Sequence, residues 1–199
     1  YETALTCYNN ALQIWKQLEK SEINKSLPSK ALAQAGKTRN KLSATLGNIG
    51  IIYWNQGDYP TALDHYRQAL EIDKELGNKN GVARHLGNIG IIYADQSDYP
   101  TALNHYLQAL EIDIELGNKN GEARHLGNIG LVYGDQGDYA NVHPVKRDSL
   151  LNRALDHYLQ ALEISKELGN KSHISSWLGN IGVLYAALGD LEKDAHLQD

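Results

Sequence analysis

Histidine is the residue type whose repetition in this chain first suggests a chemical site. His65, His85, His105 and His125 follow one another at intervals of 20 residues. Histidines that bind a metal from one helix are expected three or four residues apart, as in HExxH, and the sequence has neither such a pair nor CxxC. We therefore expect packing or surface roles for these histidines, with no metal and no cofactor. Because imidazole titrates near neutral pH, a ladder of them would make stability depend on pH at about pH 6.

The other reactive residues form no catalytic set. The sequence lacks GxSxG and a phosphate loop ending in GK[ST], and Cys7 has no histidine within one helical turn. The repeated Gly-Asn-x-Gly fragments fall inside predicted helices and not after strands, which excludes a dinucleotide fingerprint. We expect no enzymatic activity in this segment. A single cysteine cannot form an internal disulfide, which favours a reducing, cytoplasmic location.

Charge and hydrophobicity restrict the class of partner. A formal net charge of -5 and a pI near 5.9 argue against nucleic acid, whose phosphates require a basic surface. No apolar run approaches the roughly 20 residues of a membrane span, so we expect no membrane insertion. A hydrophobic content of 42% is enough for a packed core. Tyr1 is not a natural start, so we expect the chain to be a piece of a longer protein.

A period of 40 residues organises the chain. Residues 51–90 and 91–130 are identical at 33 of 40 positions, and the string LGNIG begins at Leu46, Leu86, Leu126 and Leu178. A fixed period of this length indicates a stacked repeat protein. Repeat proteins of this kind use extended curved surfaces for binding.

Each repeat is predicted to be a pair of antiparallel helices. Val82, Leu86, Ile89 and Tyr93 follow helical spacing on the first helix of one pair. That helix should end near Ser97, where the other repeats have Gly57 and Gly137. The second helix should begin after Asp98 with Pro100 in its first turn. Its apolar stripe runs over Ala102, Leu103, Tyr106, Ala109, Leu110 and Leu116, and Asp113 interrupts it.

These residues resemble the tetratricopeptide repeat. The resemblance rests on Leu86, Ile89-Gly90, Tyr93, Asp98-Tyr99, Ala102, Tyr106 and Ala109. The longer period and the Leu-Gly-Asn string are similar to the repeats of polarity adaptors, kinesin light chains and bacterial signalling proteins. The resemblance implies an all-α, right-handed superhelical solenoid of stacked antiparallel helix pairs.

We expect one array over residues 1–199, interrupted by two insertions. The first insertion is predicted to be a loop at 24–28 followed by helix from Ser29, and the second a loop at 140–147 followed by a helix capped by Asp148. Near the end, Gly189-Asp190-Leu191 should lead into a second helix that stops at Asp199. The expected parts are a second helix at 1–20, an insertion and lead-in at 21–41, repeats at 42–79, 82–119 and 122–171 (the last with an inserted loop at about 140–152), and a partial repeat at 174–199.

The resemblance also implies a concave groove lined by the first helices. Asn48, Asn88, Asn128 and Asn180 match the family's asparagine ladder, which holds a peptide by its backbone; the alternative is that they bond to neighbouring helices. Gly47, Gly87, Gly127 and Gly179 precede them, either to admit a ligand backbone or to let successive helices approach. The remaining groove candidates are Trp54, Asn55, Arg84, Arg124, Asp95 and Asp135, with solvated charges, or packing of Trp54 on the first insertion, as the alternatives.

The predicted function is a non-catalytic scaffold that binds a peptide or protein segment in the groove. Charges of both signs among the candidates favour a partner of mixed charge. Two other functions remain open: self-assembly through the incomplete terminal repeats, and a sensory or regulatory module of a larger signalling protein.

Overall fold

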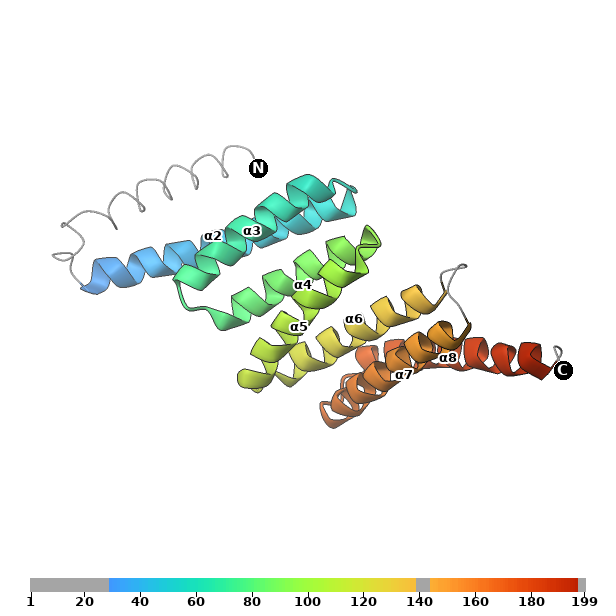
Figure 1. Ribbon diagram of the computed structural model, residues 1–199. Helices are drawn as coiled ribbons and strands as arrows, with labels where there is room; N and C mark the ends of the chain where they lie inside the picture. Colours follow the sequence, from blue (N-terminus) through green and yellow to red (C-terminus); the bar gives the residue numbers. More distant parts are fainter. Residues whose placement is uncertain (1–28, 139–143, 197–199) are drawn as a thin grey trace. The chain divides into compact units, whose positions relative to one another are not determined.

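The computed structural model describes residues 29–138 and 144–196, and every regular element in those residues is a helix (Figure 1). The helices are α2 (Ser29–Asn55), α3 (Tyr59–Glu75), α4 (Lys79–Asp95), α5 (Tyr99–Glu115), α6 (Lys119–Asp138), α7 (Pro144–Glu167) and α8 (Lys171–His196). The chain divides into two compact units, Tyr1–Gly81 and Val82–Asp199. The prediction of an all-α fold built from helix pairs is confirmed. The second helix predicted at 1–20 lies outside the described residues.

Short side-chain caps start the second helix of a pair. The Asp58 carboxylate accepts a hydrogen bond from the Thr61 N–H at 3.2 Å, and Asp98 accepts one from the Thr101 N–H at 3.3 Å. A proline follows in the first turn, where its missing N–H leaves no bond unmade. The preceding residues, Gly57 and Ser97, have φ values of 77° and 60°, so the chain leaves the first helix through a left-handed residue, as predicted near Ser97.

The next pair starts with an asparagine cap. Gly77, Gly117 and Gly169 end α3, α5 and α7 with positive φ. The asparagine that follows each of them accepts a hydrogen bond from a backbone N–H three residues later, at 3.1–3.3 Å. These are Asn78, Asn118 and Asn170. The repeated Gly-Asn pair therefore both ends one helix and begins the next.

A glycine–tyrosine contact closes each pair. A Cβ added at Gly50 or Gly90 would lie within 2.6–2.7 Å of the ring of Tyr66 or Tyr106, on the second helix of the same pair. Gly130 has the corresponding contact with Tyr158 at 3.1 Å. Because no side chain separates the helices at these points, their backbones approach closely and bury the tyrosines.

Each unit has its own core. In the first unit, α2 and α3 bury Leu42, Leu46, Ala69 and Ile72 together, and the Ser43 hydroxyl donates to the Asp73 carboxylate at 2.7 Å. In the second unit, one cluster joins Ala102 and Tyr106 of α5 to Ile129 and Val132 of α6. A further cluster joins Leu151, Ala154, Tyr158 and Leu162 of α7 to Ile181 and Leu184 of α8.

Two predicted boundaries are wrong: the start of α7 and the turn expected within α8. The helix expected from Asp148 begins at Pro144, so most of the loop predicted at about 140–152 is helix; Leu150 and Leu151 are buried in it. α6 ends at Asp138, in agreement with the end predicted near Gly137, whereas α8 continues through Gly189 to His196 with no turn. Pro60 and Pro100 prevent a first helix from continuing, and the corresponding residue within α8 is Glu192. The start of the helix predicted at Ser29 is confirmed.

Candidate binding surface on the first helices

The second glycine ladder lets neighbouring first helices touch. A Cβ at Gly87 of α4 would lie 2.5 Å from Nε2 of His125 on α6, and a Cβ at Gly127 of α6 would overlap the ring of Trp177 on α8. Of the two explanations offered by the sequence, close approach of successive helices therefore holds at these two glycines. At Gly179, in the same register on α8, nothing lies within 4 Å of the Cβ position.

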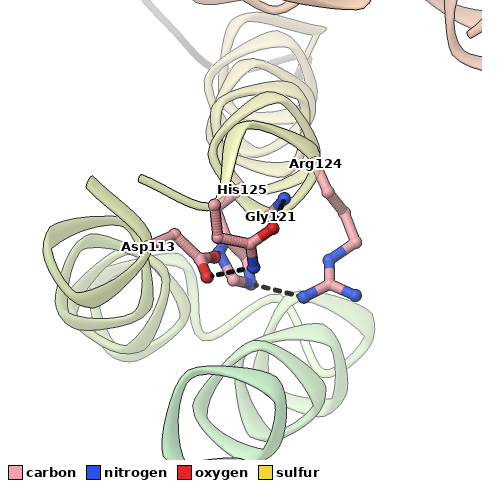
Figure 2. Close-up of polar contacts among 5 residues, drawn as sticks. Asp113, Gly121, Arg124 and His125 are labelled. Atoms are coloured by element: carbon pink, nitrogen blue, oxygen red, sulfur yellow. Dashed lines mark hydrogen bonds and ion pairs between the residues drawn. The ribbon is translucent and has the colours of Figure 1, made fainter. Parts of the chain in front are cut away.

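The His125 ring belongs to a buried polar network (Figure 2). Its Nδ1 lies 2.9 Å from Oδ2 of Asp113 on α5, and both side chains are almost fully buried. Oδ1 of Asp113 accepts a hydrogen bond of 2.7 Å from the Asn118 amide, whose oxygen caps α6. On the other side of the ring, the Arg124 guanidinium lies 3.4 Å from Nε2. A neutral imidazole with its proton on Nδ1 accepts from Arg124 at Nε2. Its Nδ1 and Oδ2 of Asp113 make a close polar contact whose geometry is not that of a hydrogen bond.

Burial sets the protonation of this network. Burial, together with the positive charge of Arg124, lowers the pKa of His125 to about 3. Burial raises the pKa of the Asp113 carboxyl, against the hydrogen bond from Asn118, which favours the ionised form. A proton added to His125 would have no acceptor at Nε2, where a guanidinium already lies. The prediction that the histidines have packing roles agrees with the complete burial of His85 and His125.

In the sequence, Asp113 stands out only as a break in an apolar stripe. The signal that would have identified it is a spacing of 12 residues, which relates Asp73 to His85 and Asp113 to His125. The same spacing relates Ser165 to Trp177, where the indole Nε1–H donates to the serine hydroxyl at 3.2 Å. At Asp113 and Ser165, a polar residue on the second helix thus contacts a ring of the next first helix, and that ring packs on a glycine.

A second stripe runs along α4 and α6 and shares Arg124 with this network. On α6 it consists of Arg124, Asn128, Leu131 and Asp135, at helical spacings of four, three and four. Arg124 and Asp135 are exposed, Asn128 is half-buried and Leu131 is 47% exposed. The corresponding residues of α4 are Arg84, Asn88, Ile91 and Asp95. We call these eight residues the outer stripe. Its apolar members, Ile91 and Leu131, were not among the predicted site residues.

The outer stripe has a positive and a negative end. Although Arg124 as a whole residue is exposed, its guanidinium is partly buried where it meets His125. This burial is the main cause that lowers the pKa of Arg124, and the charge of Arg84 lowers it further, so the two guanidinium groups lie near each other. Burial raises the pKa of Tyr106, and the charges of Asp95 and Asp135 raise it further, so both carboxylates lie near that hydroxyl group. Two asparagines and two aliphatic side chains stand between the charged ends.

The other predicted site residues have different surroundings. Asn180 of α8 lies near Tyr158 of α7, because its amide acts against the rise in the pKa of Tyr158 that burial causes. Asn48, Trp54 and Asn55 belong to the first unit, where Trp54 is half-buried and Asn48 and Asn55 are exposed. Among the described residues, no group of three or more histidine, cysteine or acidic side chains has the geometry to hold a metal ion. None of the helices in the described ranges is long and apolar enough to cross a membrane.

Helix pairs repeated at a fixed period, with small residues at the helix contacts, define a helical-repeat protein. The tetratricopeptide repeat family model matches residues 29–75, 41–115 and 81–150, which together cover more than half of the chain. The chain therefore belongs to the tetratricopeptide repeat family. Repeats of this family generally mediate protein–protein interactions, and its members are typically non-catalytic scaffolds.

Solved structures agree with this fold at low sequence identity. The chain is similar to RapI in its apo form, with a TM-score of 0.63 and 18% identity over 92% of this chain and 55% of that one. A tetratricopeptide domain of a putative FK506-binding protein from Plasmodium falciparum has a TM-score of 0.54 and 18% identity, over 79% of this chain and 95% of that one. The N-terminal domain of stress-induced protein-1 from C. elegans has a TM-score of 0.51 and 14% identity, over 71% of this chain and 96% of that one. The chain spans about half the length of RapI. Comparison with curated protein sequences found no match.

Proposed function

We propose that the outer stripe of α4 and α6 binds an extended segment of a partner protein that carries opposite charges at its two ends. The observation that supports this most is the separation of charge along the stripe, with Arg84 and Arg124 at one end and Asp95 and Asp135 at the other. An acidic residue of the segment would pair with the guanidinium groups, and a basic residue with the carboxylates.

The middle of the outer stripe suits the backbone and apolar side chains of such a segment. Asn88 and Asn128 are half-buried, and each amide offers both donors and an acceptor to a peptide backbone. Leu131 is 47% exposed. An apolar side chain of the segment that packed on Leu131 would remove this apolar surface from water, which favours binding. The asparagines would thus hold the backbone, while the charged ends set the direction of the segment.

A double substitution tests this proposal. Asn88→Ala with Asn128→Ala removes two amides that supply about 0.5–1.5 kcal/mol each, so binding should weaken roughly 5- to 150-fold. Partners would be captured from a lysate of the source cells and identified by mass spectrometry. Synthetic segments of the captured partner would then be titrated by fluorescence anisotropy. Thermal melting should stay nearly unchanged, because both side chains are partly in solvent.

The matched control removes two exposed amides from α5, with Asn104→Ala and Gln108→Ala. The control should bind as the wild type does, and binding to the wild type should weaken with salt because charged ends contribute. Equal binding by the wild type and the Asn88/Asn128 variant would contradict the proposal. Parallel loss of binding and of folding would show that the asparagines are structural.

A further inference from the structure

One face of α8 lacks the cover that the same face has on α4 and α6. Leu178 is 52% exposed, whereas the corresponding Leu86 and Leu126 are 4% and 5% exposed. Gly179 and Gly182 are exposed, and nothing lies within 4 Å of either Cβ position. We call this surface the α8 face; it consists of Ser175, Leu178, Gly179, Gly182, Tyr185 and Ala186, which follow helical spacing and include no charged residue.

The equivalent faces show which side chains cover such a surface. On α6, the Tyr158 ring lies 3.1 Å from the Cβ position of Gly130, and the Ala154 backbone oxygen lies 3.2 Å from it. On α4, Tyr106 lies over Gly90. The covering element is therefore a second helix that presents an alanine and, four residues later, a tyrosine. On the α8 face, Gly182 is the glycine that this tyrosine would meet.

Residues following α8 in this chain do not have that pattern. Asp194 and Gln198 stand at the positions that correspond to Ala102 and Tyr106. α8 also continues as one helix to His196, so the chain does not turn back at Gly189. A carboxylate in place of the alanine would be buried without a partner, which is unfavourable.

A segment elsewhere in the sequence has the pattern. Residues 3–14, TALTCYNNALQI, match residues 101–112, TALNHYLQALEI, at the seven positions Thr3, Ala4, Leu5, Tyr8, Ala11, Leu12 and Ile14. In α5 these are the residues that include the buried Ala102, Tyr106 and Ala109. Segment 3–14 has no charged residue, as the α8 face has none. The second helices α3, α5 and α7 already pack within the described chain.

We propose that the α8 face binds segment 3–14 of a second copy of this chain, with Tyr8 over Gly182. The contact uses different surfaces on the two copies, so it is a heterologous, head-to-tail interface. Such an interface generates rings or open chains of copies. It would bury Leu178 and Tyr185, which are 52% and 57% exposed in the single chain.

The first experiment measures the mass of the chain in solution by sedimentation velocity, from about 1 to about 200 µM, because association depends on concentration by mass action. The wild type should increase in mass over this range. Gly182→Leu should raise the dissociation constant more than tenfold, because the leucine occupies the position of the Tyr8 ring. It should leave helicity and melting of the single chain intact, because the Cβ position is open and leucine is a better helix former than glycine.

The adjacent Val183 provides the matched control. It is 65% exposed, and the corresponding Leu131 stays 47% exposed on α6 even though that helix is covered. Val183→Glu should therefore leave the association unchanged. Loss of association in both variants would point to non-specific apolar contact and would overturn the proposal.

A mixing experiment distinguishes head-to-tail contact from other self-association. Gly182→Leu removes the receiving face and Tyr8→Ala removes the inserted ring, so neither variant should associate alone. Mixed, they retain one intact interface between them and should form a 1:1 dimer that grows no further. A wild type that stays monomeric at every concentration, or a mixture that stays monomeric, would overturn the proposal. The Asn88→Ala/Asn128→Ala variant should still self-associate, which separates this inference from the proposed function.

Discussion

Replacing Gly87 with alanine should destabilise the second unit, although alanine is the better helix former. The added Cβ would lie 2.5 Å from Nε2 and 3.3 Å from Cδ2 of His125, closer than atoms in ordinary van der Waals contact. The His125 ring is fully buried and lies 2.9 Å from Asp113, so it cannot move aside without losing that contact.

The expected magnitude follows from three terms. Overpacking of a core costs about 1–3 kcal/mol. Displacing the ring from Asp113 leaves a buried polar group without its partner, at about 1–3 kcal/mol. The higher helix propensity of alanine offsets about 1 kcal/mol of this loss of stability. We therefore expect Gly87→Ala to lower the free energy of unfolding by about 1–5 kcal/mol, measured by urea denaturation followed by circular dichroism.

The chain contains its own control. Gly179 has the same register on α8, but nothing lies within 4 Å of its Cβ position. Gly179→Ala should therefore raise stability by up to about 1 kcal/mol, measured at low protein concentration. Combining Gly87→Ala with His125→Ala should cost less than the sum of the two single changes, because the clash is gone. If Gly87→Ala were as stable as Gly179→Ala, the packing of His125 on Gly87 would be refuted.

Three further predictions concern the helix ends and the buried network. Ser97→Gly should stabilise the chain by about 0.5–1 kcal/mol, because Ser97 has a φ of 60° that costs a residue with a Cβ more than glycine; Ser97→Ala should give no such gain in urea denaturation. The pKa of His125 is lowered to about 3, so the unfolded chain binds its proton first, and stability should fall by up to about 1.4 kcal/mol per pH unit as the pH drops below about 6.5. The raised pKa of Asp113 affects stability in the opposite direction, so it reduces this loss of stability at lower pH. NMR signals of the His125 ring should not titrate between about pH 7.5 and 5. A titration midpoint near 6.5 would contradict the lowered pKa of His125. Asp113→Ala should destabilise by about 1–3 kcal/mol in thermal unfolding, since the Asn118 amide would lose its acceptor and His125 its close contact with the carboxylate. An unchanged melting temperature would show that the network contributes little.

The helix pairs could be predicted from the sequence because the signals that form them are local. Asp98 and Pro100 act within one turn of their own helix, and the spacing of Leu86, Ile89 and Tyr93 shows one buried face without any knowledge of its neighbour. The continuation of α8 has a local cause as well, since Glu192 stands where the equivalent repeats have a proline. The register of the asparagine ladder could also be predicted from the repeat, and its role in binding remains a proposal.

Only the tertiary structure shows which contacts Gly87 and Asp113 make. Each has a partner on another helix, and His125 is that partner for both. A mid-helix glycine and an aspartate within an apolar stripe are both unfavourable by local criteria. They are accommodated when the repeats stack, because the ring fills the space over the glycine and brings its Nδ1 to 2.9 Å from the carboxylate. Local preferences therefore determine the helices of this chain, and contacts between residues distant in the sequence determine how those helices fit together.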